Sequence, residues 1–276
     1  MFWQRVLVTA VLLPLGIAAV ILGGIYYFLL VTVFIVLAAV EYVQMFRQCG
    51  YQLAGVLVVG GVLLMALGRA YDGFNSAPWI ASLLILLSMA YHLFSYERGR
   101  DQAATDFCLS LGGIFYLGWI GSYFISLRDL PDGAWWFWMA LGPVLFADSI
   151  AYAIGKNFGR HKLSPRLSPK KTWEGYWAGV VAGTLSGLVI GAIFQAWMGL
   201  RGYPTAPITP LHGLLMGMVM SVLTTLGDLG ESMFKRQLGF KDSGSLLPGH
   251  GGFFDRVDAW LWAMVIGYYM AVWFIK

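Results

Sequence analysis

The stretch IYYFLLVTVFIVLAAVEYVQMF, residues 25–46, contains one charged side chain, Glu41, in a run that is otherwise mostly apolar. Its length is close to the ~20 residues that a helix needs to cross a bilayer. About eight further segments of this kind lie at residues 6–22, 53–69, 78–95, 106–127, 134–155, 173–199, 211–230 and 257–275. Helices satisfy their own backbone hydrogen bonds in lipid. We therefore expect an all-α polytopic membrane protein with about nine transmembrane helices.

The overall composition agrees with this expectation. Of the 276 residues, 59% are hydrophobic and 12% are charged, whereas soluble domains carry about 25% charged residues. Most of the basic side chains lie in two segments, residues 156–171 and 235–256. Basic loops stay on the cytoplasmic side of a membrane. We expect both segments to face the cytoplasm, where nucleotides are found.

The chain divides by chemistry. Residues 1–130 are predicted to form N-terminal transmembrane helices with short polar connections, and residues 131–276 a C-terminal transmembrane catalytic region. Glu41 and His92 are the ionisable exceptions within the first part. We interpret His92 as structural. Glu41 is interpreted as an interfacial or helix-paired carboxylate, with a role in a site as the alternative.

The first chemical block is ADSIAYAIGKNFGRHKLSPRLSPKKTWEG, residues 147–175. Asp148, Tyr152 and Lys156 are spaced four apart, so they share one face of a helix. A carboxylate at that depth must pair, for example with Lys156, or bind a ligand. The basic loop that follows contains two Ser-Pro turns. It is predicted to contact a triphosphate or a lipid phosphate, and the alternative is that it only meets anionic headgroups.

A polar stripe runs along the segment at residues 211–230 and beyond it. Ser221, Thr225, Asp228, Ser232 and Lys235 follow helical spacing. Helix–helix hydrogen bonding would account for the hydroxyls but not for the charged members. We therefore expect the stripe to line a polar cavity that opens to the cytoplasm.

The second chemical block is SMFKRQLGFKDSGSLLPGHGGFFDRVD, residues 232–258. Lysine and arginine suit phosphates, carboxylates suit Mg²⁺, and a Gly-His-Gly-Gly turn lets the backbone approach a ligand. The chain has no Walker P-loop, HExxH motif or zinc cysteine cluster. Physical reasoning from these residues indicates metal-dependent phosphate chemistry at the cytoplasmic membrane face.

This second block resembles the signature of the phosphatidate cytidylyltransferases, S-x-x-K-R-x(4)-K-D-x-G-x-x-L-P-x-H-G-G-x-x-D-R-x-D, at every fixed position. Residues 147–175 are similar to the second motif of that family, except that Ile150 stands where a small residue is usual. The resemblance implies that CTP and phosphatidic acid react to give CDP-diacylglycerol and pyrophosphate. A CTP-dependent lipid kinase and a non-catalytic membrane transporter are the alternatives.

The resemblance, together with the two blocks, implies roles for particular residues. The expected catalytic residues are Asp228, Asp255, Lys235 and Arg256. The expected substrate-binding residues are Lys156, Lys170, Lys171, Ser232, Arg236, Lys241, Asp242, His250, Gly251 and Gly252. Asp228 and Asp255 are expected to bind Mg²⁺, with Asp148 as a further candidate, and a second cation such as K⁺ is expected in the same site.

The expected partners are CTP, phosphatidic acid and membrane lipids, with a homodimer as an open alternative and no nucleic acid. We expect an integral protein of a bacterial inner membrane, with its active site facing the cytoplasm.

Overall fold

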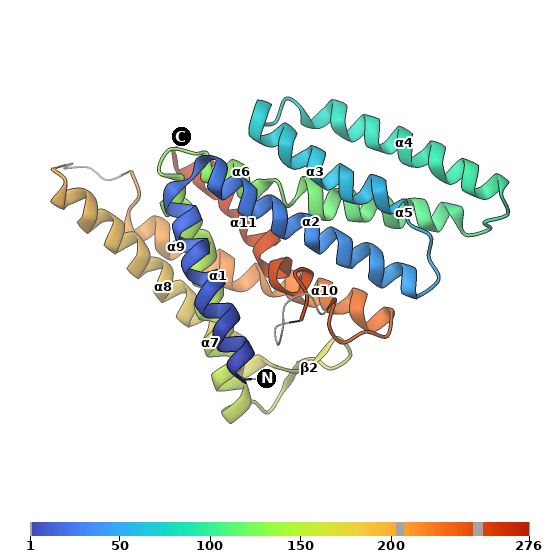
Figure 1. Cartoon of the computed structure of the whole chain (residues 1–276). Coiled ribbons are helices and arrows are strands. Elements are labelled where there is room, and N and C mark those ends of the chain that lie inside the picture. The colour runs from blue at the N-terminus through green and yellow to red at the C-terminus, as the bar shows by residue number, and fades with distance from the viewer. Residues whose placement is uncertain (1, 203–206, 245–250, 276) are drawn as a thin grey trace. The chain divides into compact units, whose positions relative to one another are not determined.

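The computed structural model describes residues 2–202, 207–244 and 251–275, and almost all of its regular structure is helical (Figure 1). The elements are α1 (Phe2–Leu22), α2 (Gly24–Gln48), α3 (Gly55–Asp72), α4 (Ala77–Glu97), α5 (Ala103–Gly113), the π-helix η1 (Ile114–Trp119), α6 (Tyr123–Arg128), α7 (Gly133–Phe158), β1 (Lys162–Ser164), β2 (Ser168–Thr172), α8 (Trp173–Leu200), α9 (Pro210–Leu223), α10 (Thr225–Gln237) and α11 (Phe254–Ile275).

Eight helical stretches of the described chain are long and apolar enough to cross a membrane. They match the predicted segments from residues 25–46 onward. The first predicted segment, 6–22, lies in α1, whose described apolar part, Ala10–Leu22, is shorter than a full span. The all-α, polytopic membrane class is therefore confirmed.

The backbone forms two compact units that do not follow the order of the chain. The first unit combines Met1–Ser126 with Phe234–Val257, and the second combines Leu127–Met233 with Asp258–Lys276. The division predicted after residue 130 was based on chemistry and stays a prediction. The compact units show in addition that most of the charged block at residues 232–258 packs with the N-terminal helices.

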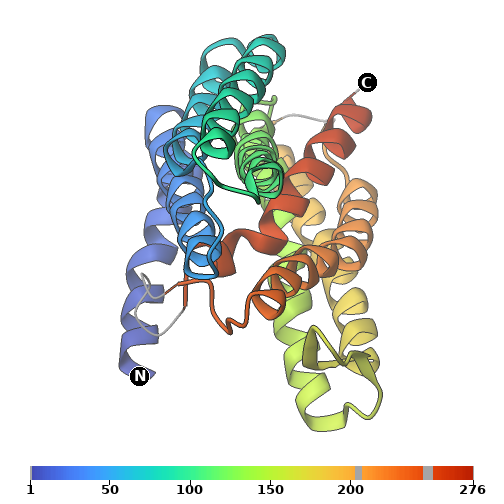
Figure 2. The same cartoon turned by 90° about the vertical axis from the view of Figure 1, so that its right-hand side faces the viewer.

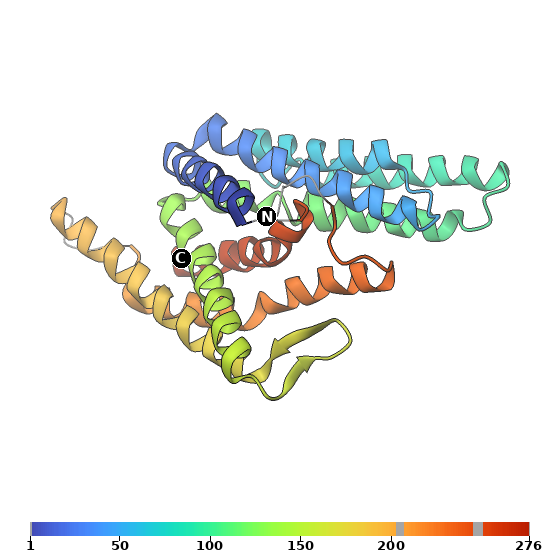
Figure 3. The same cartoon turned by 60° about the horizontal axis from the view of Figure 1, so that its bottom comes forward.

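In the first unit, α2, α3, α4 and α5 run alongside one another (Figure 3). The hydroxyl of Tyr42 in α2 donates to the carbonyl oxygen of Leu109 in α5 at 3.0 Å. Buried His92 in α4 has its Nδ1 2.8 Å from the carbonyl oxygen of Ser88, which agrees with its structural interpretation. These bonds satisfy polar groups inside the bundle, as an apolar surrounding requires.

Aromatic rings fasten the Phe234–Val257 segment to α2. The ring of Tyr42 lies 6.1 Å from that of Phe234 and 6.1 Å from that of Phe254, in edge-to-face arrangements. Phe34 and Phe253 meet in the same way at 5.0 Å. Edge-to-face pairs at these distances are favourable. They place the start of α11 against the middle of α2.

In the second unit, α7, α8 and α9 approach closely because glycines line α8 (Figure 2). A β-carbon added at Gly179 would lie 2.8 Å from the carbonyl oxygen of Ala147 in α7. One added at Gly187 would overlap the carbonyl oxygen of Gly213 in α9. Small residues at such interfaces let helix backbones pack in the membrane, where van der Waals contact contributes much of the association energy.

We expect Gly187→Ala to destabilise the second unit by about 1–3 kcal/mol, because the added methyl group must force α8 and α9 apart. Gly199→Ala in the same helix is the matched control. Nothing lies within 4 Å of a β-carbon at Gly199, so alanine there should leave stability unchanged or raise it slightly. Thermal unfolding of both variants in one detergent measures the difference. Equal melting temperatures would contradict the packing explanation.

The basic loop after α7 contains a feature that the all-α prediction did not include. β1 and β2 pair antiparallel, with Lys162 opposite Thr172 and Ser164 opposite Ser168 (Figure 2). The two Ser-Pro steps were predicted only as turns. Instead, Ser168 of the second step begins β2, which contains Lys170 and Lys171 and ends directly before α8.

The segment predicted at residues 211–230 is not one continuous helix. α9 ends at Leu223, and α10 begins at Thr225. The hydroxyl and the backbone N–H of Thr224 both donate to the carbonyl oxygen of Met220, at 2.7 and 3.0 Å. The Gly227 N–H then bonds three residues back to Thr224 instead of four, which marks the turn between the two helices. The predicted polar stripe is therefore divided. Ser221 is buried in α9 and donates to Gly217, whereas the charged members lie on α10.

Candidate active site

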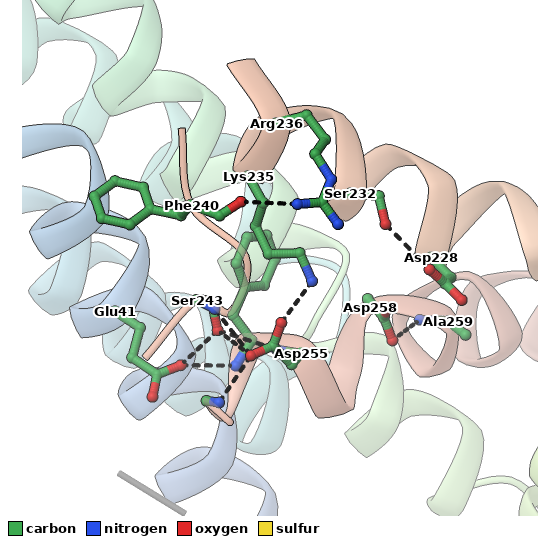
Figure 4. Close-up of polar contacts among 12 residues, drawn as sticks. Glu41, Asp228, Ser232, Lys235, Arg236, Phe240, Ser243, Asp255, Asp258 and Ala259 are labelled. Carbon is green, nitrogen blue, oxygen red and sulfur yellow. Dashed lines mark hydrogen bonds and ion pairs between the residues drawn. The ribbon is translucent and has the colours of Figure 1, made fainter. Parts of the chain in front are cut away.

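Asp255, in the first turn of α11, is the most densely bonded carboxylate of the first unit (Figure 4). Its Oδ2 accepts from the backbone N–H groups of Ser243 at 2.9 Å and Gly252 at 2.8 Å, and from the Ser243 hydroxyl at 3.0 Å. Several donors on one oxygen stabilise a negative charge there. Gly251 has φ +81°, a conformation that glycine adopts readily, and this turn brings the Gly252 N–H to the carboxylate.

The other oxygen of Asp255 is paired with a lysine. The ammonium of Lys235, on α10, lies 2.6 Å from Asp255 Oδ1. The side chains are 12% and 8% exposed, so solvent screens this pair only weakly. The pair brings together two residues of the charged block that lie 20 positions apart in the sequence.

A second carboxylate, that of Glu41, shares the Ser243 hydroxyl with Asp255. Glu41 of α2 is 1% exposed, and its Oε2 accepts from the Ser243 hydroxyl at 3.1 Å and from the Phe254 N–H at 3.0 Å (Figure 4). Neither interpretation of Glu41, as an interfacial or helix-paired carboxylate or as a site residue, is contradicted. One of its partners, Phe254, is the first residue of the transmembrane helix α11, and the other, Ser243, belongs to the charged block.

The second unit contains its own carboxylate–lysine pair. Lys171, on β2, lies with its ammonium 2.5 Å from Asp228 Oδ2 on α10. The Ser232 hydroxyl donates to Asp228 Oδ1 at 3.4 Å. The two side chains of the ion pair are 25% and 33% exposed, so this pair is more open than the one at Asp255.

The hairpin holds Lys171 in place through the start of α8. The hydroxyl of Thr172 caps the helix by accepting from the Gly175 N–H at 3.2 Å. Glu174 accepts from the backbone N–H groups of Arg160 at 3.1 Å and His161 at 3.2 Å, and its Oε1 lies 2.6 Å from His161 Nδ1. These bonds fix the end of β2 that carries Lys171 to the start of α8.

The remaining predicted residues are mostly exposed. The exposed side chains are those of Asp148 and Lys156 of α7, Lys170, Arg236, Lys241, Asp242 and Arg256. Arg236 Nη1 donates to the Phe240 carbonyl oxygen at 3.4 Å. His250 lies outside the described residues. The structure thus groups Lys235, Gly251, Gly252 and Asp255 in the first unit. It groups Lys171, Asp228 and Ser232 in the second unit, where Asp148 of α7 lies within electrostatic range of Lys171 and Asp228.

Comparison with known proteins identifies the family. A family model described as "Cytidylyltransferase family" matches residues 3–274. The chain belongs to this family. A phosphatidate cytidylyltransferase of Synechocystis sp. is 33% identical over 98% of this chain and 96% of the relative. Relatives of the same name from Bacillus subtilis (strain 168) and Staphylococcus aureus (strain COL) are 32% and 27% identical over 97% and 94% of this chain and 96% and 95% of their own lengths.

The described carboxylates of this cytidylyltransferase form no metal site by themselves. Within the described ranges, no three His, Cys, Asp or Glu side chains form a group that could hold a metal ion with protein ligands alone. Mg²⁺ usually keeps several waters and is bound through one or two carboxylates together with substrate phosphates. Asp228 and Asp255 are carboxylates of this kind, and in the structure each is paired with a lysine.

The sequence of this cytidylyltransferase left the role of Glu41 open and did not predict its contacts. The signal was present, because an ionisable residue in a transmembrane segment is a candidate site residue by default. Its partners, Ser243 and Phe254, follow 202 and 213 positions later. Spacing along one helix does not reveal a contact over that separation.

Proposed function

We propose that this cytidylyltransferase transfers the cytidylyl group of CTP to phosphatidic acid, giving CDP-diacylglycerol and pyrophosphate. The observation that carries the proposal is the match to relatives named phosphatidate cytidylyltransferase over 97–98% of this chain. Two carboxylate–lysine pairs, at residues of the charged blocks, supply the groups that such a transfer uses.

In the proposed reaction, a phosphate oxygen of phosphatidic acid attacks the α-phosphorus of CTP. A new P–O bond forms there, the bond to the bridging oxygen of the β-phosphate breaks, and pyrophosphate leaves with that electron pair. The second ionisation of a phosphomonoester lies near pH 6, so the lipid phosphate is already a dianion at neutral pH. No side chain has to remove a proton from the nucleophile.

Asp228 and Asp255 would hold Mg²⁺, with Asp148 as a further candidate and a second cation such as K⁺ in the same site. When bound, Mg²⁺ neutralises phosphate oxygens and orients them for displacement. Lys171 and Lys235 lie beside the two principal carboxylates and would stabilise negative charge on the transferring and leaving phosphates. This arrangement leaves the protein to bind and orient the reactants and to stabilise charge.

The exposed cations would guide the two anionic substrates. They are Lys156, Lys170, Arg236, Lys241 and Arg256. The proposed substrate-binding residues also include Asp242, His250, Gly251, Gly252 and Ser232. Lysine and arginine attract phosphates over several ångströms, and exposed side chains can follow a ligand as it enters.

The site is proposed to face the cytoplasm of a bacterial inner membrane, because the basic segments at residues 156–171 and 235–256 carry most of the positive charge. CTP would enter from water, while phosphatidic acid keeps its acyl chains in lipid. A polar cavity that opens both to the cytoplasm and to the bilayer would meet both requirements.

An assay of the purified protein with CTP, phosphatidic acid and Mg²⁺ tests this function. We expect pyrophosphate and CDP-diacylglycerol in equal amounts, and no product without Mg²⁺. Release of CDP would identify a lipid kinase, and absence of turnover would favour a transporter. Inverted membrane vesicles should convert added CTP, whereas right-side-out vesicles should not. Activity only in right-side-out vesicles would reject the cytoplasmic orientation.

A further inference from the structure

Glu41 holds the turn that carries Asp255 through a single oxygen. Its Oε2 accepts both hydrogen bonds, from the Ser243 hydroxyl and the Phe254 N–H. In the part of the chain that the structure describes, Oε1 has no hydrogen-bond partner. Leaving a carboxylate oxygen buried without a donor is costly. A position that keeps such a group needs a reason other than packing.

Two glycines of the charged block make room for Glu41. A β-carbon on Gly252 would overlap Glu41 Oε2, and one on Gly244 would overlap Oε1. Gly252 belongs to the Gly-His-Gly-Gly turn that was predicted to let the backbone approach a ligand, and Gly244 precedes it in the same charged block. In the structure, the group that approaches these two backbones is the Glu41 side chain of the protein itself.

The Ser243 hydroxyl connects Glu41 with Asp255. Its oxygen lies 3.1 Å from Glu41 Oε2 and 3.0 Å from Asp255 Oδ2, and it accepts from the Asp255 N–H at 3.3 Å (Figure 4). A serine hydroxyl has one proton, so it donates to one of these carboxylates at a time. The two carboxylates are therefore coupled through one side chain, which is 8% exposed.

We propose that Glu41 is a positioning residue for Asp255. By binding the Phe254 N–H and the Ser243 hydroxyl, it fixes the turn before α11 and thereby the direction of the Asp255 carboxylate. Glu41 does not touch the substrates in this proposal. The inference rests on the proposed function, in which Asp255 takes part in the reaction.

The chemistry of the contacts predicts how different substitutions behave. Glutamine at position 41 retains a carbonyl oxygen that can accept both bonds. Methionine has a similar size but has no strong acceptor, so the Phe254 N–H and the Ser243 hydroxyl lose their partner. Small misplacements of a reacting group cost turnover more than they cost substrate affinity.

The test compares Glu41→Met, Glu41→Gln and Ser243→Ala in the full-length protein. Gln44→Met is the matched control, since Gln44 is an exposed polar residue of the same helix. Three quantities are measured: kcat and KM for CTP, hydrogen–deuterium exchange of residues 251–257 without substrate, and the melting temperature. The exchange measurement does not depend on activity. It therefore separates a failure of this inference from a failure of the proposed function.

We expect Glu41→Met to lower kcat about tenfold with less than about a threefold change in KM, and to speed exchange in residues 251–257. Glu41→Gln should restore most of both properties, and Gln44→Met should match the wild type. Ser243→Ala should resemble Glu41→Met, and the two changes together should be less than additive.

Wild-type kcat or wild-type exchange in Glu41→Met would overturn the proposal, as would equal damage from glutamine and methionine. If Glu41→Met does not fold, Ser243→Ala decides, and wild-type exchange and kcat in that variant would reject the coupling. If the wild-type protein itself shows no cytidylyl transfer, the proposed function fails, while the exchange data still test whether Glu41 holds the turn.

Discussion

Asp255→Asn is expected to lower kcat for CDP-diacylglycerol formation by at least about 1,000-fold. The substitution removes the charge that the proposed Mg²⁺ requires. It also places an amide NH₂ group where one carboxylate oxygen now faces Lys235 or the Ser243 and Gly252 N–H groups. Steady-state kinetics with saturating CTP and phosphatidic acid measure the loss.

The control for this variant is Asp101→Asn, which makes the same chemical change at an exposed position of the first unit. It should retain wild-type kcat. The melting temperature of Asp255→Asn shows whether the turn still folds. A folded Asp255→Asn protein with near-normal turnover would remove Asp255 from the reaction.

Lys171→Met is expected to lower kcat about 100-fold, because the charge beside Asp228 is then lost. Lys170→Met, the same change at the preceding residue, should cost less than about tenfold, since the Lys170 side chain is exposed. The comparison separates a lysine fixed in the site from one that only raises local positive charge. Kinetics of both variants in a single preparation of mixed micelles provide the measurement.

The surrounding lipid distinguishes the two explanations of the basic hairpin. If the hairpin only anchors to anionic headgroups, both losses should disappear in neutral detergent micelles. If Lys171 contacts the substrates, its loss should be the same in neutral and anionic micelles. Equal effects of Lys170→Met and Lys171→Met would contradict a special position for Lys171.

The membrane helices were predictable because a helix that crosses a lipid bilayer must be apolar, and this shows directly in its own residues. A run such as residues 25–46 has to be apolar along its whole length to cross a bilayer, and that property is read directly from the chain. The charged blocks were equally plain, since Asp228, Asp255 and their lysines stand out against apolar flanks. The ion pair of Asp255 with Lys235, 20 positions apart, was not among these predictions.

Other features depend on competition between local alternatives. The stretch from Lys162 to Thr172 reads as a turn-rich loop, yet its backbone pairs as a hairpin. The break at Thr224 has no local sequence signal, since Thr184 makes the same hydroxyl bond to the carbonyl four residues earlier within the unbroken α8. The contacts of Glu41 join residues that lie more than 200 positions apart in the sequence. Hydrophobic periodicity contains no information about any of these three.

The first compact unit is discontinuous, and this affects how the protein is made. Ser126 and Phe234 belong to the same unit, and at about 5–20 residues per second the ribosome needs on the order of 5–20 s to synthesise the roughly 100 residues between them. During this interval Glu41 is already in the chain, but Ser243 and Phe254, which later bond to it, do not yet exist. A nascent chain interrupted before these residues would leave an unpaired carboxylate in an inserted helix, a costly state in lipid. Completion of the unit therefore depends on translation as far as residue 257, and a fragment that ends before Ser243 would lack both partners of Glu41.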